Sequence, residues 1–131
     1  MPRSRPARKW GRKQSNGDMV TRYVPEAGDI VMMDFDSHVG REQAKRRPAL
    51  VLTDQRYNRA SGLAVVCPLT SKRKPYPFAL PITVDQVEGA VLVDHLKSMD
   101  WAGRKAKFRS TADPALVGKV RQYVAVLLEL R

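Results

Sequence analysis

Residues 28–35 have the sequence GDIVMMDF, residues 48–53 have PALVLT and residues 63–69 have LAVVCPL. Each stretch contains an apolar run of strand length beside turn-forming or polar residues. Runs with so few polar interruptions are typical of strands that are covered on both faces. Two more strands are expected over 78–83 and 89–94. Short strands separated by turns favour a small β-barrel over an open sheet that alternates with helices.

The connections between these strands differ in length and charge. Residues 36–47 form a polar segment that is longer than most connections, and loops of this length tend to be functional. Pro48 is expected at the first residue of the second strand, where a missing N–H is tolerated. Residues 57–62 are expected to form a turn, and residues 71–77 a basic loop that contains Tyr76.

The end of the chain has helical patterning. Asp113 is a good N-cap, and Pro114 suits the first position of a helix. Apolar residues then recur at helical spacing, namely Leu116, Val120, Tyr123, Val124 and Leu127. We therefore expect an amphipathic helix over 114–131 that packs on the strands. The fold class is mainly β (α+β), with about five to seven strands.

Net charge is the most informative part of the composition. The 131 residues contain 24 Lys and Arg against 13 Asp and Glu, which gives a formal net charge of +11. Such a charge favours a polyanionic partner, first nucleic acid, then an acidic protein segment, then an anionic membrane. The alternative is that the protein is basic without a charged partner.

The N-terminal residues hold about half of this charge. Residues 1–22 contain seven basic residues and one acidic residue. Apart from Met1, Trp10 is the only large apolar side chain in residues 1–18, so this segment cannot bury enough surface to fold. We expect a disordered basic extension over 1–18, either a solvated arm or a tether to RNA or DNA. One domain is expected over 19–131.

Several classes of site are absent from the sequence. Because Cys67 is the single cysteine, an internal disulfide is excluded, which fits a reducing cytosol. Cys67 is expected to be a buried, unreactive thiol. His38 and His95 have no zinc-ligand spacing, and each is expected to be a surface or packing residue. The sequence has no phosphate-binding loop, nucleophile elbow, HExxH motif or paired-carboxylate cluster, and no apolar run long enough to span a membrane. We expect no metal site, no cofactor, no membrane partner and a cytoplasmic location.

Charged, hydroxyl and aromatic side chains surround the second and third strands. Glu42 and Arg47 come before the second strand, and Thr70 ends the third. A basic loop follows, with Lys72, Arg73, Lys74 and Tyr76. Basic side chains neutralise phosphates, and Tyr76 or Phe35 can stack a base. Composition alone does not place Arg47 beside Thr70, so the residues by themselves predict only a basic groove with aromatic side chains.

Seven short motifs resemble the MazF branch of the MazF/PemK toxin family in order and spacing. They are YVPEAGD at 23–29, DFD at 34–36, GREQAKRRPALVL at 40–52, YN at 57–58, PLTS at 68–71, YPF at 76–78 and DHLKSMDW at 94–101. The resemblance extends from residue 19 to the C-terminal helix. It is specific, because G-x-E-Q-x-x-x-R-P together with K-S-x-D-W is hard to reach by chance.

This resemblance implies the toxin of a toxin–antitoxin pair, with a homodimeric, SH3-like or CcdB-like β-barrel. It implies a metal-independent endoribonuclease that cuts single-stranded mRNA at a short sequence. An acidic, MazE-like antitoxin would lie across the same groove, with toxin and antitoxin forming a hetero-oligomer. By motif position, Arg47 and Thr70 act at the scissile phosphate and Glu42 is the loop glutamate, whereas Arg46 is left without a role. RNA contacts are expected from Phe35, Lys72, Arg73, Lys74 and Tyr76.

The implied chemistry uses the RNA's own 2′-hydroxyl. Its attack on the adjacent phosphate leaves a 2′,3′-cyclic phosphate and a 5′-hydroxyl. Arg47 can donate N–H bonds to the phosphate oxygens, but a guanidinium that stays protonated is a poor general base. Glu42 either takes the 2′ proton or orients Arg47 through an ion pair. Thr70 bonds a phosphate oxygen or the leaving 5′ oxygen, or alternatively only the backbone.

Two other functions remain open from the sequence. Toxins of the same barrel class that poison DNA gyrase rely on a hydrophobic C-terminal tip, whereas this chain ends in Leu128-Glu129-Leu130-Arg131. A nucleic-acid-binding module without catalysis also fits the charge. Many relatives have a glycine where Pro75 stands, so the cleavage sequence of a relative does not transfer to this chain.

Overall fold

The computed structural model describes residues 23–35, 46–72 and 76–130. The elements are β1 (Asp29–Asp34), β2 (Arg46–Val51), α2 (Gln55–Ser61), β3 (Leu63–Thr70), β4 (Ala79–Val84), β5 (Val87–Leu92), a 3₁₀ turn (Val93–His95), β6 (Lys97–Asp100), β7 (Lys107–Thr111) and α3 (Pro114–Leu128). The expected extension over 1–18 and His38 lie outside the described residues. No helix within these ranges is long and apolar enough to cross a membrane.

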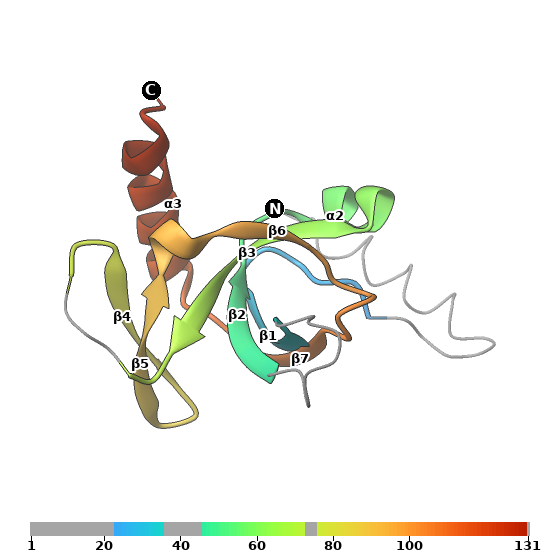
Figure 1. Cartoon of the computed structure of the whole chain (residues 1–131), viewed down its shortest axis with the longest axis horizontal. Helices are drawn as coiled ribbons and strands as arrows, with labels where there is room; N and C mark the ends of the chain where they lie inside the picture. Colours follow the sequence, from blue (N-terminus) through green and yellow to red (C-terminus); the bar gives the residue numbers. More distant parts are fainter. Residues whose placement is uncertain (1–22, 36–45, 73–75, 131) are drawn as a thin grey trace, which may run out of the picture.

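Seven antiparallel strands form a curled sheet in the order β4-β5-β3-β2-β1-β7, and β6 pairs with β3 outside that path. Residues 63–68 of β3 pair with β2 and β6, whereas Leu69 and Thr70 pair with β5. The β4–β5 hairpin therefore diverges from β1 and β2, and the C-terminal end of α3 points away from the sheet (Figure 1). The expected fold is confirmed as a mainly β half-barrel with a C-terminal helix.

Two hydrophobic clusters cover the two faces of the sheet, because strand residues alternate between faces. The first cluster contains Ile30 and Leu50, and α3 covers it with Val117 and Val120. The second cluster consists of Val31, Met33, Ala49, Val51, Ala64, Val66 and Met99. Ile30 and Val31 are neighbours in β1, yet each is only 1% exposed. This confirms the expectation that the strands are covered on both faces.

Cys67 and His95 occupy the environments expected for them. Cys67 is fully buried in the first cluster. Burial, with a smaller contribution from the charge of Asp94, raises the pKa of its thiol to about 12. His95 ends the 3₁₀ turn with an exposed side chain. A buried thiol with a raised pKa is unreactive at neutral pH.

The helix after residue 113 begins as expected and ends earlier. The Asp113 carboxylate accepts from the N–H of Ala115, and Pro114 is the first helical residue. α3 ends at Leu128 because Glu129 is in the left-handed region, with a φ of 58°. The expected boundary at residue 131 is therefore too late.

The turn expected over 57–62 is wrong, since most of this segment belongs to α2. The Asp54 side chain caps that helix by accepting from the N–H groups of Arg56 and Tyr57. Gly62 then ends the helix with a φ of 78°, a conformation that favours glycine. The sequence contained both signals, an aspartate before the segment and a glycine at its end.

The strand that contains Pro48 begins two residues earlier than expected, so the proline is not its first residue. The ladder between β2 and β3 ends at the pair Ala49–Pro68. The N–H that Pro48 lacks therefore removes no bond from that ladder. β6 and β7 are not predictable from apolar runs, because both are short and mostly exposed.

Asn58 is the buried polar residue of the described core and links three segments. Its amide nitrogen donates to the carbonyl oxygens of Pro25 and Thr53, each at 2.8 Å. Its amide oxygen accepts from the Thr53 hydroxyl at 2.6 Å. The indole N–H of Trp101 donates to the Asn58 carbonyl at 2.9 Å. The segment before β1, helix α2 and the end of β6 thus meet at one residue.

We expect Asn58→Ala to lower the free energy of unfolding by about 2–4 kcal/mol, because it leaves buried backbone and hydroxyl groups without partners. Urea unfolding followed by tryptophan fluorescence measures the change. Arg56→Ala on the exposed side of the same helix is the control, with an expected effect within about 0.5 kcal/mol. Equal stability of the two variants would contradict the central role of Asn58.

Candidate functional site

Arg47 and Thr70 lie where β2 and β3 separate. The β2–β3 ladder ends at the pair Ala49–Pro68. Continued by two residues, the same register would set Arg47 opposite Thr70. On its other edge, β3 pairs with β5 at this point, and Thr70 lies opposite Ala90. The fold thus brings the two residues to the same end of the sheet.

Strand alternation places both side chains on one face. Arg47 and Ala49 are two residues apart in β2 and therefore share a face, as do Val66, Pro68 and Thr70 in β3. Ala49 and Val66 belong to the second cluster, so Arg47 and Thr70 extend the face of that cluster beyond its apolar part. The sequence left their relative placement open, and the register provides it.

The ring of Phe35 contacts two cations on this face. The guanidinium carbon of Arg47 lies 5.5 Å from the ring centroid. The ammonium nitrogen of Lys97, the first residue of β6, lies 5.8 Å from the same centroid. Both distances are in the range of cation–π contacts. Phe35 therefore contacts the side chain of Arg47, and its stacking on a base stays a prediction.

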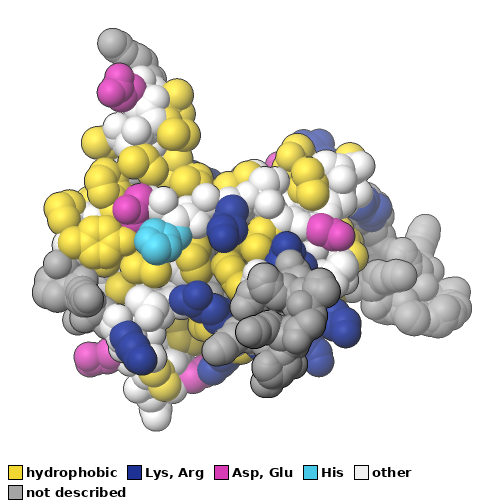
Figure 2. Space-filling view, in the orientation of Figure 1, with side chains coloured by type: hydrophobic (Ala, Val, Ile, Leu, Met, Phe, Trp, Pro, Cys, Tyr) yellow, Lys and Arg dark blue, Asp and Glu magenta, His cyan; other side chains and the backbone are white. Residues whose placement is uncertain are grey.

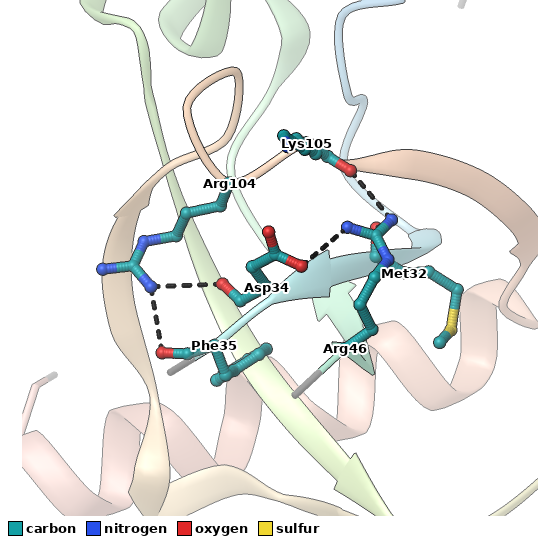
Figure 3. Close-up of polar contacts among 6 residues, drawn as sticks. All are labelled: Met32, Asp34, Phe35, Arg46, Arg104 and Lys105. Carbon is teal, nitrogen blue, oxygen red and sulfur yellow. Dashed lines mark hydrogen bonds and ion pairs between the residues drawn. The ribbon is translucent and has the colours of Figure 1, made fainter. Parts of the chain in front are cut away.

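Two arginines hold the backbone that carries Phe35 (Figure 3). Arg104 donates to the carbonyl oxygens of Asp34 at 3.1 Å and Phe35 at 2.9 Å. Arg46 forms an ion pair of 2.9 Å with the Asp34 carboxylate and donates to two further backbone carbonyls. Arg46 therefore has a structural role in the strand, next to the residue proposed for chemistry.

The Thr70 hydroxyl is half-buried and partly engaged. Its oxygen accepts from the N–H of Lys72 at 3.1 Å, which is the backbone bond that the sequence left open. The hydroxyl hydrogen remains able to donate to another oxygen. A Cβ at Gly89 would collide with the Thr70 carbonyl, so this glycine allows β5 to approach β3. Thr70 also lines a cavity of about 100 Å³ with Pro48 and Leu69.

Tyr76 follows the basic loop, and its hydroxyl donates to the Asp94 carboxylate at 2.7 Å. Burial, this bond and the charge of Asp94 raise the pKa of Tyr76 to about 12. Lys72 is exposed at the start of the loop. Three expected site residues lie outside the described ranges: Glu42, Arg73 and Lys74.

Two cations on this face, Arg47 and Lys97, form no ion pair with a carboxylate of the described residues. Two ion pairs occur among the described residues, and neither includes Arg47 or Lys97. Lys and Arg side chains gather across the middle of one face of the molecule (Figure 2). In the same ranges, no group of three or more His, Cys, Asp or Glu side chains is placed to hold a metal ion. The arrangement is suited to binding an anion.

Lys97 and Arg104 reach this face without having been identified as site residues from the sequence. Lys97 is the first residue of the K-S-x-D-W motif, so the motif itself was the available signal. Arg104 follows a turn in which the Asp100 carboxylate accepts from the N–H of Gly103. Its contact with β1 joins residues 69 or 70 positions apart.

The chain is similar to known toxins over most of its length. Residues 26–128 match the family described as PemK-like, MazF-like toxin of type II toxin–antitoxin system. The "Endoribonuclease toxin MazF" of Escherichia coli (strain K12) is 37% identical over 110 residues, which cover 84% of this chain and 99% of that protein. The "Endoribonuclease PemK" of Escherichia coli is 27% identical and covers 92% of this chain and 98% of its own length. The crystal structure of MazE–MazF (Form-II) from Deinococcus radiodurans superposes with a TM-score of 0.75 and 41% identity, over 84% of this chain and 100% of that one.

We expect Tyr76 to titrate near pH 12, and Asp94→Asn to move its pKa down toward the ordinary value of about 10. The raised pKa means that the stabilising bond is present below pH 10 and is lost as the pH rises through 12. Near-ultraviolet absorbance during alkaline titration, with Tyr76→Phe as the difference control, isolates this phenol. If the group that Tyr76→Phe removes titrates near pH 10 and not near pH 12, Tyr76 does not donate to Asp94.

Proposed function

The chain belongs to the family of PemK-like, MazF-like toxins of type II toxin–antitoxin systems, and we propose that it cuts single-stranded mRNA at a short sequence with Arg47 and Thr70. Its relatives MazF, ChpB and PemK are named endoribonucleases. Their similarity covers most of this chain, which is accordingly an mRNA-cleaving endoribonuclease toxin. The observation that supports the proposed site is the placement of Arg47 and Thr70 at one end and on one face of the β2–β3 ladder.

Arg47 stabilises the charge that develops at phosphorus. The 2′-oxygen forms a new P–O bond while the bond from phosphorus to the 5′-oxygen breaks, so the 2′ proton leaves and the 5′-oxygen gains one. Negative charge builds on the non-bridging oxygens between these steps. A guanidinium donates two N–H bonds in a fixed fork and keeps its charge, which suits this state. The nucleophile is part of the RNA, and the proposed cleavage uses no metal ion.

Thr70 and Glu42 have complementary roles in the proposal. The Thr70 hydroxyl, whose oxygen already accepts from the backbone, donates its hydrogen to a non-bridging oxygen or to the leaving 5′-oxygen. Glu42, outside the described residues, either takes the 2′ proton or orients Arg47. Both roles require Glu42 to be ionised.

An acidic antitoxin is the proposed protein partner. The Deinococcus radiodurans relative forms a complex titled MazE–MazF. The net charge of +11 and the unpaired cations of the described face favour an acidic, MazE-like segment across the same groove. We further propose a homodimeric toxin that acts in the cytoplasm, where mRNA is translated, and that forms hetero-oligomers with the antitoxin.

A gyrase-directed toxin is the alternative that one observation favours. The C-terminal end of α3 exposes Val126, Leu128 and Leu130, which are 68%, 53% and 61% accessible. Gyrase-poisoning toxins of the same barrel class rely on an apolar C-terminal tip, whereas Glu129 and Arg131 add charges to this one. A supercoiling assay with purified protein tests it, and unchanged gyrase activity beside RNA cleavage eliminates it. A binding module without catalysis would yield no cleaved RNA at all.

Arg47→Ala is expected to lower the cleavage rate by about 10²–10³-fold, the usual loss when one charge-stabilising donor is removed. Primer extension on a long RNA measures the rate and maps the cut. Arg56→Ala on α2, away from this face, is the matched control and should cleave normally. Reactions are run with and without EDTA, and cleavage that is abolished by EDTA and restored by Mg²⁺ would overturn the mechanism.

Deletion of residues 2–18 is expected to weaken RNA binding and leave the single-turnover cleavage rate unchanged. The deletion removes six basic residues. If each contacts a phosphate, the dependence of log affinity on log salt becomes less steep by about 0.7 per contact. A filter-binding titration at several salt concentrations measures this slope. An unchanged slope would mean that the extension is a solvated arm and not a tether.

A further inference from the structure

The contact of two cations with one aromatic ring is the starting observation. Arg47 and Lys97 lie 5.5 Å and 5.8 Å from the centroid of Phe35. Their charged groups are therefore no more than about 11 Å apart. Neither side chain forms an ion pair with a carboxylate of the described residues. Two positive charges therefore lie near one aromatic ring in the described part of the chain.

The strand pairings place Lys97 on the same face as Arg47. Lys97 in β6 is directly opposite Val66 in β3, and Val66 is directly opposite Val51 in β2. Residues that are directly opposite in neighbouring strands share a face. Arg47 lies on the same side of β2 as Val51, because four residues separate them and side chains alternate. Lys97 is exposed, so its ammonium group is accessible to a ligand.

The energetics of this arrangement favour an anionic ligand. A cation–π contact at an exposed site contributes only about 0.5–1 kcal/mol. Two like charges at this separation repel each other, although solvent weakens the repulsion. A ligand with two negative charges at a similar spacing attracts both cations and offsets the repulsion between them. An RNA backbone carries one negative charge on every phosphate and meets this requirement.

We propose that Lys97 binds the RNA phosphate next to the scissile one, with Phe35 fixing its distance from Arg47. This inference rests on the proposed function, in which Arg47 holds the scissile phosphate. Lys97 meets a phosphate that does not react, so it binds the substrate and the transition state equally. Its loss therefore raises KM with little change in kcat, whereas the loss of Arg47 lowers kcat.

The experiment combines Lys97→Ala with RNA oligonucleotides in which one phosphate is replaced by an uncharged methylphosphonate. The replacement is made in turn at the two linkages that flank the cut site mapped by primer extension. For the wild-type protein, one of the two replacements should raise KM about 10-fold, the cost of one charge-assisted contact. Lys97→Ala should raise KM about as much on unmodified RNA. With the same neutral linkage, Lys97→Ala should show no further increase.

Control variants separate this role from general electrostatics. Lys119→Ala removes the charge of an exposed lysine on α3 and should leave both the KM and the methylphosphonate penalty unchanged. Lys97→Arg keeps a cation and should restore most of the affinity. Phe35→Leu keeps both cations and removes the ring. It should raise KM and lower kcat together, because it releases Arg47 as well as Lys97.

The outcomes distinguish the inference from the function beneath it. Equal methylphosphonate penalties in wild type and Lys97→Ala would overturn the Lys97 contact, while the endoribonuclease would stand. A fall in kcat with unchanged KM in Lys97→Ala would also overturn it, because Lys97 would then act at the reacting phosphate. Failure of the wild-type protein to cleave any RNA would remove the function and the inference together.

Discussion

The register between β2 and β3 is the constraint on which the rest of the structure depends. β3 pairs with β2, β5 and β6, so both hydrophobic clusters and the whole curl of the sheet are built around it. A slip of one residue would turn the side chains of β2 to the opposite face. The guanidinium of Arg47 would then point into the first cluster, where Leu50 and Cys67 are fully buried. The cost of burying that charge keeps Arg47 on the face of the second cluster.

The sequence predicted those parts of the fold that have strong local signals. Each of the five expected strands is present within about two residues, because long apolar runs have few alternatives to a buried strand. Asp113 and Pro114 predicted the start of α3 for a comparable reason. α2 was missed because the turn-forming residues Asn58 and Gly62 outweighed the cap at Asp54. β6 and β7 depend on pairing partners that lie far away in the sequence, so their short, exposed segments gave no signal.

The site was predictable in its residue types and not in its geometry. Arg47 and Thr70 were named from motif position, but their placement at one end follows from a register that composition does not contain. The contact of Lys97 with Phe35 joins residues 62 positions apart. Val66 of β3 pairs with both Val51 of β2 and Lys97 of β6, so β6 lies on the edge of β3 opposite β2, and the contact depends on the curl of the sheet. Arg46 is adjacent to Arg47 in the sequence, yet it forms an ion pair with Asp34 and has a structural role.

The charge of this face has a consequence for how the toxin can be controlled. Guanidinium and ammonium groups keep their charge across the physiological pH range, and no carboxylate of the described residues neutralises Arg47 or Lys97. An anion supplied by another molecule can therefore bind these cations without displacing a carboxylate of the described residues. An acidic antitoxin segment and an RNA strand would compete for the same charges, and each would exclude the other. The competition favours the segment whose carboxylates match the spacing set by Phe35, because charges at other spacings gain less from the two cations.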